Sequence, residues 1–197
     1  MPSPAVAKTA RKMLESPLDF EGFLSKLSPK DRTNAERRAA TIDTEAGEPR
    51  ASLWRRLAAT LTTLAPVCKL VGKQTIQFYI PDGKYRMQVF ALEDLQDGTI
   101  TVYCPNKLAE AVEAGILKPD TSQPHMHTIK SAKQPIYVEA IDGNTTNPPD
   151  HVKDLVGWNR KALKIMLPQN ASPEQTETAE LLCAIAAAGF VKAEAGK

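Results

Sequence analysis

Long apolar segments are absent from this sequence. No run of about 18 apolar residues occurs in the 197-residue chain, so a membrane-spanning helix of ordinary length is excluded. The first residues, MPSPAVAKTARKMLES, contain no apolar core of the kind that a signal peptide needs. We therefore expect a soluble protein that resides in the cytoplasm.

Cysteine is scarce, and its spacing carries no motif. The three cysteines, Cys68, Cys104 and Cys183, are far apart and form no CxxC pair, so neither a zinc ribbon nor a dithiol redox motif is supported. Cys183 lies in the apolar run LLCAIAA and is expected to be buried as a small hydrophobic side chain. A reducing compartment fits this usage best.

Motifs for phosphate binding and for catalysis are also missing. The net charge of +2 is too small to favour strong nonspecific binding to nucleic acid or anionic lipid. The ten glycines form neither GxxxxGK[ST] nor GxGxxG, and GxSxG and HExxH do not occur either. Whether the protein is an enzyme therefore stays open at the level of sequence.

Helix-start signals dominate the first third of the chain. A Ser-Pro pair recurs at Ser16, Ser28 and Ser172, where serine can cap a helix and proline suits the first helical position. Only Ser172 with Gln175 makes a full capping box. Residues 1–46 are predicted to be helical, either as an appendage or docked on a single α+β domain that spans residues 49–197. Within that domain, a helix over about residues 50–64 places leucines 53, 57, 61 and 64 on one stripe.

After Pro66 the apolar period changes from helical to alternating. VCKLV, TIQFYI, YRMQVFAL and TITVYC are separated by short turns, most of which contain glycine, and they predict a four-stranded antiparallel meander. Residues 136–141 and the segment ALKIML predict one or two later strands. Helices are expected after Asn106, over about residues 150–158, and from Pro173 to a stop at Gly189. The predicted fold class is α+β, with N-terminal helices, an extended meander and C-terminal helices that pack on it.

Two histidines stand one residue apart in the segment QPHMHTIK. On an extended segment, His125 and His127 would project to the same side and could face one metal ion. A catalytic zinc site usually has a third protein ligand, for which the candidates are His151, Cys104, Asp120 and Asp142. This pattern indicates one alternative function, a hydrolase in which a divalent metal activates water. The same segment also suits an exposed connection without metal, in which case we expect no cofactor.

The second face of the meander mixes aromatic and polar side chains. If Ile76, Phe78 and Ile80 point into the core, alternation turns another set outward: Gln77, Tyr79, Arg86, Gln88, Phe90, Thr99, Thr101 and Tyr103. Such a surface suits a ligand or partner, with Tyr79, Arg86, Gln88 and Tyr103 as the binding residues. The alternative interpretation is that a helix or a second subunit covers this face.

The leading hypothesis is a non-catalytic module that binds a small ligand or a protein partner through this outer face of the sheet. Homodimerisation through the same face or through the helices predicted in residues 1–46 is a further prediction. The metal-dependent hydrolase is the alternative function. RNA binding by base stacking on the outer face is the third, and the low net charge makes nucleic acid an unfavoured partner.

Overall fold

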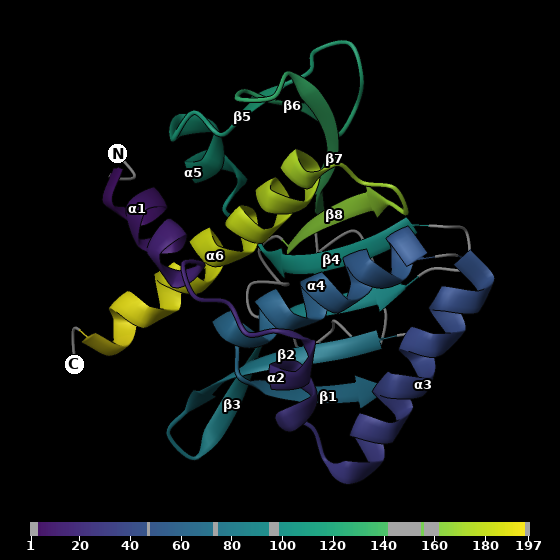
Figure 1. The fold of residues 1–197 in the computed structure, drawn as a ribbon. Helices are drawn as coiled ribbons and strands as arrows, with labels where there is room; N and C mark the ends of the chain where they lie inside the picture. The colour runs from purple at the N-terminus through teal and green to yellow at the C-terminus, as the bar shows by residue number, and fades with distance from the viewer. Residues whose placement is uncertain are drawn as a thin grey trace.

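The computed structural model describes residues 4–46, 48–72, 75–94, 99–141, 155 and 162–195. A layer of helices covers one face of an eight-stranded antiparallel sheet (Figure 1). The helices are α1 (Pro4–Met13), α2 (Phe20–Ser25), α3 (Pro29–Ala46), α4 (Glu48–Leu64), α5 (Leu108–Glu113) and α6 (Pro173–Ala195). The strands are β1 (Val67–Val71), β2 (Thr75–Asp82), β3 (Tyr85–Asp94), β4 (Thr99–Pro105), β5 (Leu117–Pro119), β6 (Met126–Ile129), β7 (Gln134–Ile141) and β8 (Ala162–Pro168).

The predicted fold class is confirmed. The sheet has the order β1-β2-β3-β4-β8-β7-β6-β5, so the meander β1–β4 is extended through β8 rather than through the next strand in the chain. Strands β7 and β8 are the later strands that the sequence predicts. Strands β5 and β6 enlarge the sheet further, because the histidine segment, expected to be a connection, pairs with β7. No helix in the described ranges is long and apolar enough to cross a membrane.

The main core lies between the sheet and the helices α4 and α6. Figure 1 shows both helices crossing the same face of the sheet, which we call the inner face. Pairs of fully buried side chains line it, such as Phe78 opposite Phe90 and Val102 opposite Ile165. Cys183 on α6 is buried in the same core, as the sequence predicts.

A β-bulge in β3 changes which side chains face inward. Phe78 pairs with Phe90, whereas the next residue, Tyr79, pairs with Gln88, so Val89 is an extra residue in β3. Simple alternation across the hairpin placed Phe90 on the outer face, and that assignment was wrong. Phe90 packs in the main core on the inner face, with no exposed surface.

The N-terminal helices α1, α2 and α3 pack on the rest of the chain. Helix α1 lies against α6, α2 against α4, and α3 against both α4 and β1 (Figure 1). Phe23 and Leu24 of α2 are buried in the main core. Arg38 of α3 forms an ion pair with the buried carboxylate of Asp94 on β3. These contacts join the helices of residues 4–46 to the sheet.

Helix α6 begins as the sequence predicts and ends later. The backbone N–H of Gln175 donates to Ser172 Oγ at 3.1 Å, and the Ser172 N–H donates to Gln175 Oε1 at 2.9 Å, which is a complete capping box. The predicted stop at Gly189 does not occur, because this glycine stays within the helix instead of taking the positive φ of a helix-ending glycine. Gly115, by contrast, has a φ of +76° just after α5.

Candidate functional site

The histidine pair does not have the extended geometry that the metal hypothesis assumes. His125 precedes β6 with a φ of +63°, in the left-handed region, so it does not continue the alternation of the strand. Its side chain is exposed, and its ring centroid lies 5.8 Å from that of Tyr137. His127 lies within β6 opposite Ile136 and is only 7% exposed. The two imidazoles therefore lie in different surroundings.

The surroundings of His127 favour its neutral form. Burial lowers the pKa of His127, and its Nδ1 lies 3.4 Å from the backbone oxygen of His125. No group of three His, Cys, Asp or Glu side chains that could hold a metal ion occurs among the residues that the structure describes. His151 and Asp142 lie outside those residues. The divalent-metal site therefore stays a prediction.

A second, smaller hydrophobic cluster covers the middle of the outer face of the sheet. It consists of Ala91, Tyr103, Ile141, Leu155 and Ala162. Leu155 also forms a parallel β-bridge with Gln88 of β3. As a result, two of the predicted binding residues are buried, Gln88 with 2% and Tyr103 with 5% of their surface exposed.

The buried phenol of Tyr103 stays protonated over the physiological range. Burial raises the pKa of Tyr103 to about 12, and the negative charges of Glu93 and Glu139 act in the same direction. This side chain can therefore donate a hydrogen bond, but it does not supply a charge near neutral pH.

The other two predicted binding residues lie together at the end of the β2–β3 hairpin. The guanidinium of Arg86 lies 4.5 Å from the centroid of the Tyr79 ring, a cation–π contact. The Tyr79 hydroxyl donates to Gln77 Oε1 at 2.8 Å. Arg86 is exposed and Tyr79 is partly exposed. The structure thus divides the four predicted residues into an exposed pair and a buried pair, and ligand binding by them remains a prediction.

A further part of the outer face, on β6, β7 and β8, was missed at the level of sequence. Met126, Tyr137 and Met166 pair across these strands and form one partly exposed row, and Glu139 opposite Lys164 forms the neighbouring row. We call these five residues the β6–β8 patch. The alternation in IYVEAI and ALKIML predicted the strands, but the partners of each strand were needed to bring the residues together.

Within the patch, Tyr137 is linked to an acidic neighbour. Its hydroxyl donates to Glu139 Oε2 at 2.8 Å. Burial raises the pKa of Tyr137 to about 12, with the hydrogen bond to Glu139 and the charge of that carboxylate acting in the same direction. The phenol therefore remains a neutral donor beside two methionine side chains. Such a surface combines soft apolar contacts with fixed polar groups.

Comparisons with protein-family models, with curated proteins and with solved structures find no match to this chain.

Proposed function

We propose that this protein is a non-catalytic protein-binding module that acts through the β6–β8 patch of its sheet. The partner that the patch fits best is a second copy of the chain. The observation that carries the proposal is the partly exposed row of Met126, Tyr137 and Met166 next to an acidic and a basic residue, Glu139 and Lys164.

The apolar row has the composition of a protein interface. Tyrosine and methionine are enriched at the centre of such interfaces. Methionine side chains adapt their shape to the opposing surface, because their three rotatable bonds and polarizable sulfur tolerate many packings. Helices α4 and α6 pack on the inner face of the sheet and leave this row on the other side.

The charges of the patch favour self-association about a two-fold axis. Glu139 and Lys164 lie opposite each other on β7 and β8, yet within the described part of the chain Lys164 makes no ion pair. A two-fold interface brings the same surface of each copy together, so each residue meets a different residue of the partner. Lys164 of one copy can then face Glu139 of the other, twice in each dimer.

Sedimentation-velocity ultracentrifugation across micromolar concentrations tests this proposal. The wild type is expected to shift from monomer to dimer as its concentration rises. Lys164→Glu and Glu139→Lys should each weaken association about tenfold or more. In each variant the side chains at positions 139 and 164 carry the same charge, so they repel each other at two places in the dimer. Lys69→Glu is the matched control, because it reverses a charge on β1, at the other edge of the sheet. A wild type that stays monomeric throughout would overturn the proposal.

A further inference from the structure

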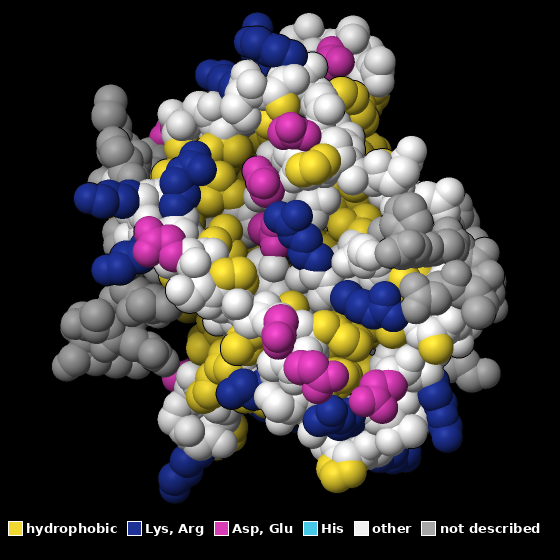
Figure 2. All heavy atoms as spheres, viewed as in Figure 1, with side chains coloured by type: hydrophobic (Ala, Val, Ile, Leu, Met, Phe, Trp, Pro, Cys, Tyr) yellow, Lys and Arg dark blue, Asp and Glu magenta, His cyan; other side chains and the backbone are white. Residues whose placement is uncertain are grey.

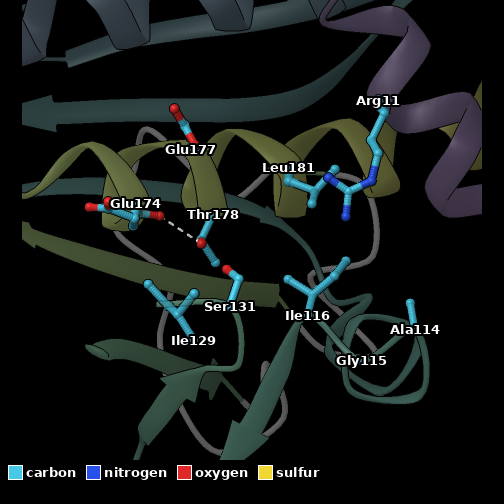
Figure 3. Close-up of a pocket in the computed structure, with 10 residues that line it drawn as sticks. All are labelled: Arg11, Ala114, Gly115, Ile116, Ile129, Ser131, Glu174, Glu177, Thr178 and Leu181. Atoms are coloured by element: carbon cyan, nitrogen blue, oxygen red, sulfur yellow. Dashed lines mark hydrogen bonds between the residues drawn. The ribbon is translucent and has the colours of Figure 1, made fainter. Parts of the chain in front are cut away.

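A small hollow lies on the helix side of the molecule, between α1, α6 and the turn that leads into β5 (Figure 3). Its volume is about 170 Å³. It is independent of the β6–β8 patch, because the two surfaces share no residue. The residues on which its chemistry depends are Arg11, Ile116, Ile129, Ser131, Glu174 and Leu181.

One wall of the hollow is apolar and well fixed. Ile116, Ile129 and Leu181 are 8%, 2% and 7% exposed, respectively, and all three belong to the main core. A chain of methylene or peptide groups could lie along this wall. Because the wall is already packed from behind, a ligand would find it largely preformed, which is typical of small-molecule sites.

The two ends of the hollow carry opposite charges. Figure 3 shows the Arg11 side chain reaching from α1 to the end of the hollow beside Leu181, and Glu174 at the opposite end with its carboxylate turned away from Leu181. Glu177, the other acid of the lining, points away from Ser131. Within the described residues, neither Arg11 nor Glu174 has an ion pair or a hydrogen-bond partner for its charged group. Both charged groups are therefore available to a ligand.

The wider surface has the same separation of charge. Figure 2 shows basic side chains gathered over α1 and acidic side chains following α6 across this face. Lys8 and Lys12 line the neighbouring hollow of about 640 Å³, which shares Arg11 with the smaller one. A ligand with a single negative charge would meet the acidic row of α6, so a ligand with opposite charges at its two ends fits this surface better.

Helix geometry gives the length of such a ligand. Glu174 and Leu181 lie seven residues apart on α6, which at 1.5 Å per residue is about 10 Å. The Glu174 carboxylate is turned away from Leu181 in Figure 3, so the two charged groups stand farther apart than this rise. After a hydrogen bond of about 3 Å at each end, an extended chain of about three amino acids fits between them, at roughly 3.3 to 3.6 Å for each residue. Thr178 lies between these ends, and its hydroxyl donates to the Glu174 backbone oxygen at 2.7 Å, so the oxygen is left as an acceptor (Figure 3).

We propose that this hollow binds a linear zwitterion of about tripeptide length. Its carboxylate accepts hydrogen bonds from the Arg11 guanidinium, which can bind a carboxylate through two parallel bonds. Its ammonium group donates to the Glu174 carboxylate. The side-chain hydroxyl of Ser131, which points toward α6 in Figure 3, and the oxygen of Thr178 lie along the middle of the chain.

Triglycine is the first probe, because it is a peptide of this length with one charge at each end. Titration of the full-length protein, followed by calorimetry and by amide chemical shifts, should show saturable binding at millimolar concentrations or below. N-acetyl-triglycine and triglycine amide, each lacking one charge, should bind about tenfold or more weakly, because each loses a charge-assisted hydrogen bond.

Two substitutions assign the charges to their partners. Arg11→Gln should weaken the binding of triglycine about tenfold, so that this variant binds triglycine no more tightly than triglycine amide. Glu174→Gln should weaken the binding of triglycine by a similar factor and bind it no more tightly than N-acetyl-triglycine. Lys12→Gln and Glu113→Gln are the matched controls, because both residues line the larger hollow but not the smaller one. Absence of saturable triglycine binding would overturn the proposal, and so would equal binding by the wild type and Arg11→Gln.

Discussion

The guanidinium of Arg56, on α4, donates two hydrogen bonds to one carboxylate oxygen of Glu180, on α6. The distances to Glu180 Oε1 are 3.1 Å from Nε and 2.6 Å from Nη2. The hydroxyl of Thr60 donates to the other carboxylate oxygen. Glu180 is only 7% exposed, so these three bonds replace most of the water that the carboxylate loses on folding. They hold together the two helices that cover the inner face of the sheet.

Arg56→Ala should therefore lower the free energy of unfolding by about 1–3 kcal/mol, because a nearly buried carboxylate keeps a single donor. The lower end of this range is expected, since the Arg56 side chain is 45% exposed and water screens the ion pair. Urea denaturation measures the change. Glu36→Ala is the control, because it breaks an exposed ion pair with Arg32 and should cost less than about 0.5 kcal/mol. Equal effects of the two substitutions would contradict this account of Glu180.

Thr101 and Thr62 are both completely buried and differ in their hydrogen bonding. Thr62 Oγ1 donates to the Ala58 backbone oxygen at 2.7 Å, whereas Thr101 Oγ1 has no partner among the described residues. Thr101→Val should raise the free energy of unfolding by about 1 kcal/mol, because it removes a buried hydroxyl without changing the shape. Thr62→Val should lower it by about 1 kcal/mol. Thermal and urea denaturation compare the two, and a loss of stability in Thr101→Val would show that this hydroxyl has a partner.

The Ser-Pro pairs at Ser16 and Ser172 should differ in their contribution to stability. Ser172→Ala should cost about 1 kcal/mol, because Ser172 caps α6 and its hydroxyl also donates to Gln134 of β7 at 2.5 Å. Ser16→Ala is the matched control within the same motif. The helix after Ser16 begins only at Phe20, with Asp19 as its cap, so this substitution should have almost no effect. Chemical denaturation measures both variants. Equal losses of stability would contradict the assignment of Ser172, and not Ser16, as a helix cap.

Stability should fall with acid in a way that depends on His127. Because burial lowers the pKa of His127, the unfolded chain binds a proton at this residue more strongly than the folded chain. The free energy of unfolding is therefore unaffected by this group well above its ordinary pKa of about 6.5, and it decreases as the pH falls below that value. His127→Gln and His127→Leu should both show a shallower decrease in urea denaturation measured at several pH values. A decrease as steep as that of the wild type would mean that other groups cause it.

Local signals in the sequence predicted most of the elements, but not the way they come together. The capping box of Ser172 and Gln175 and the glycine turns of the meander act within a few residues, so they can be recognised without a partner strand. The extra residue Val89 and the left-handed conformation of His125 depend on pairing and packing with distant segments.

The candidate sites show the same limit. Tyr103 was predicted to face outward and does so, yet Leu155, far away in the sequence, covers it. The β6–β8 patch joins Met126, Tyr137 and Met166 only because β8 lies between β4 and β7. No spacing within one segment indicates such an arrangement, since sheet order is a property of the whole fold.

The central claim, self-association through the β6–β8 patch, is tested most directly by mixing two variants. Lys164→Glu and Glu139→Lys should each sediment as monomers at a concentration where the wild type is dimeric. In an equimolar mixture each glutamate would again face a lysine across the two-fold axis, so the account predicts that a dimer reappears. The account would be contradicted if the two variants remained monomeric when mixed. It would also be contradicted if each variant alone associated as strongly as the wild type.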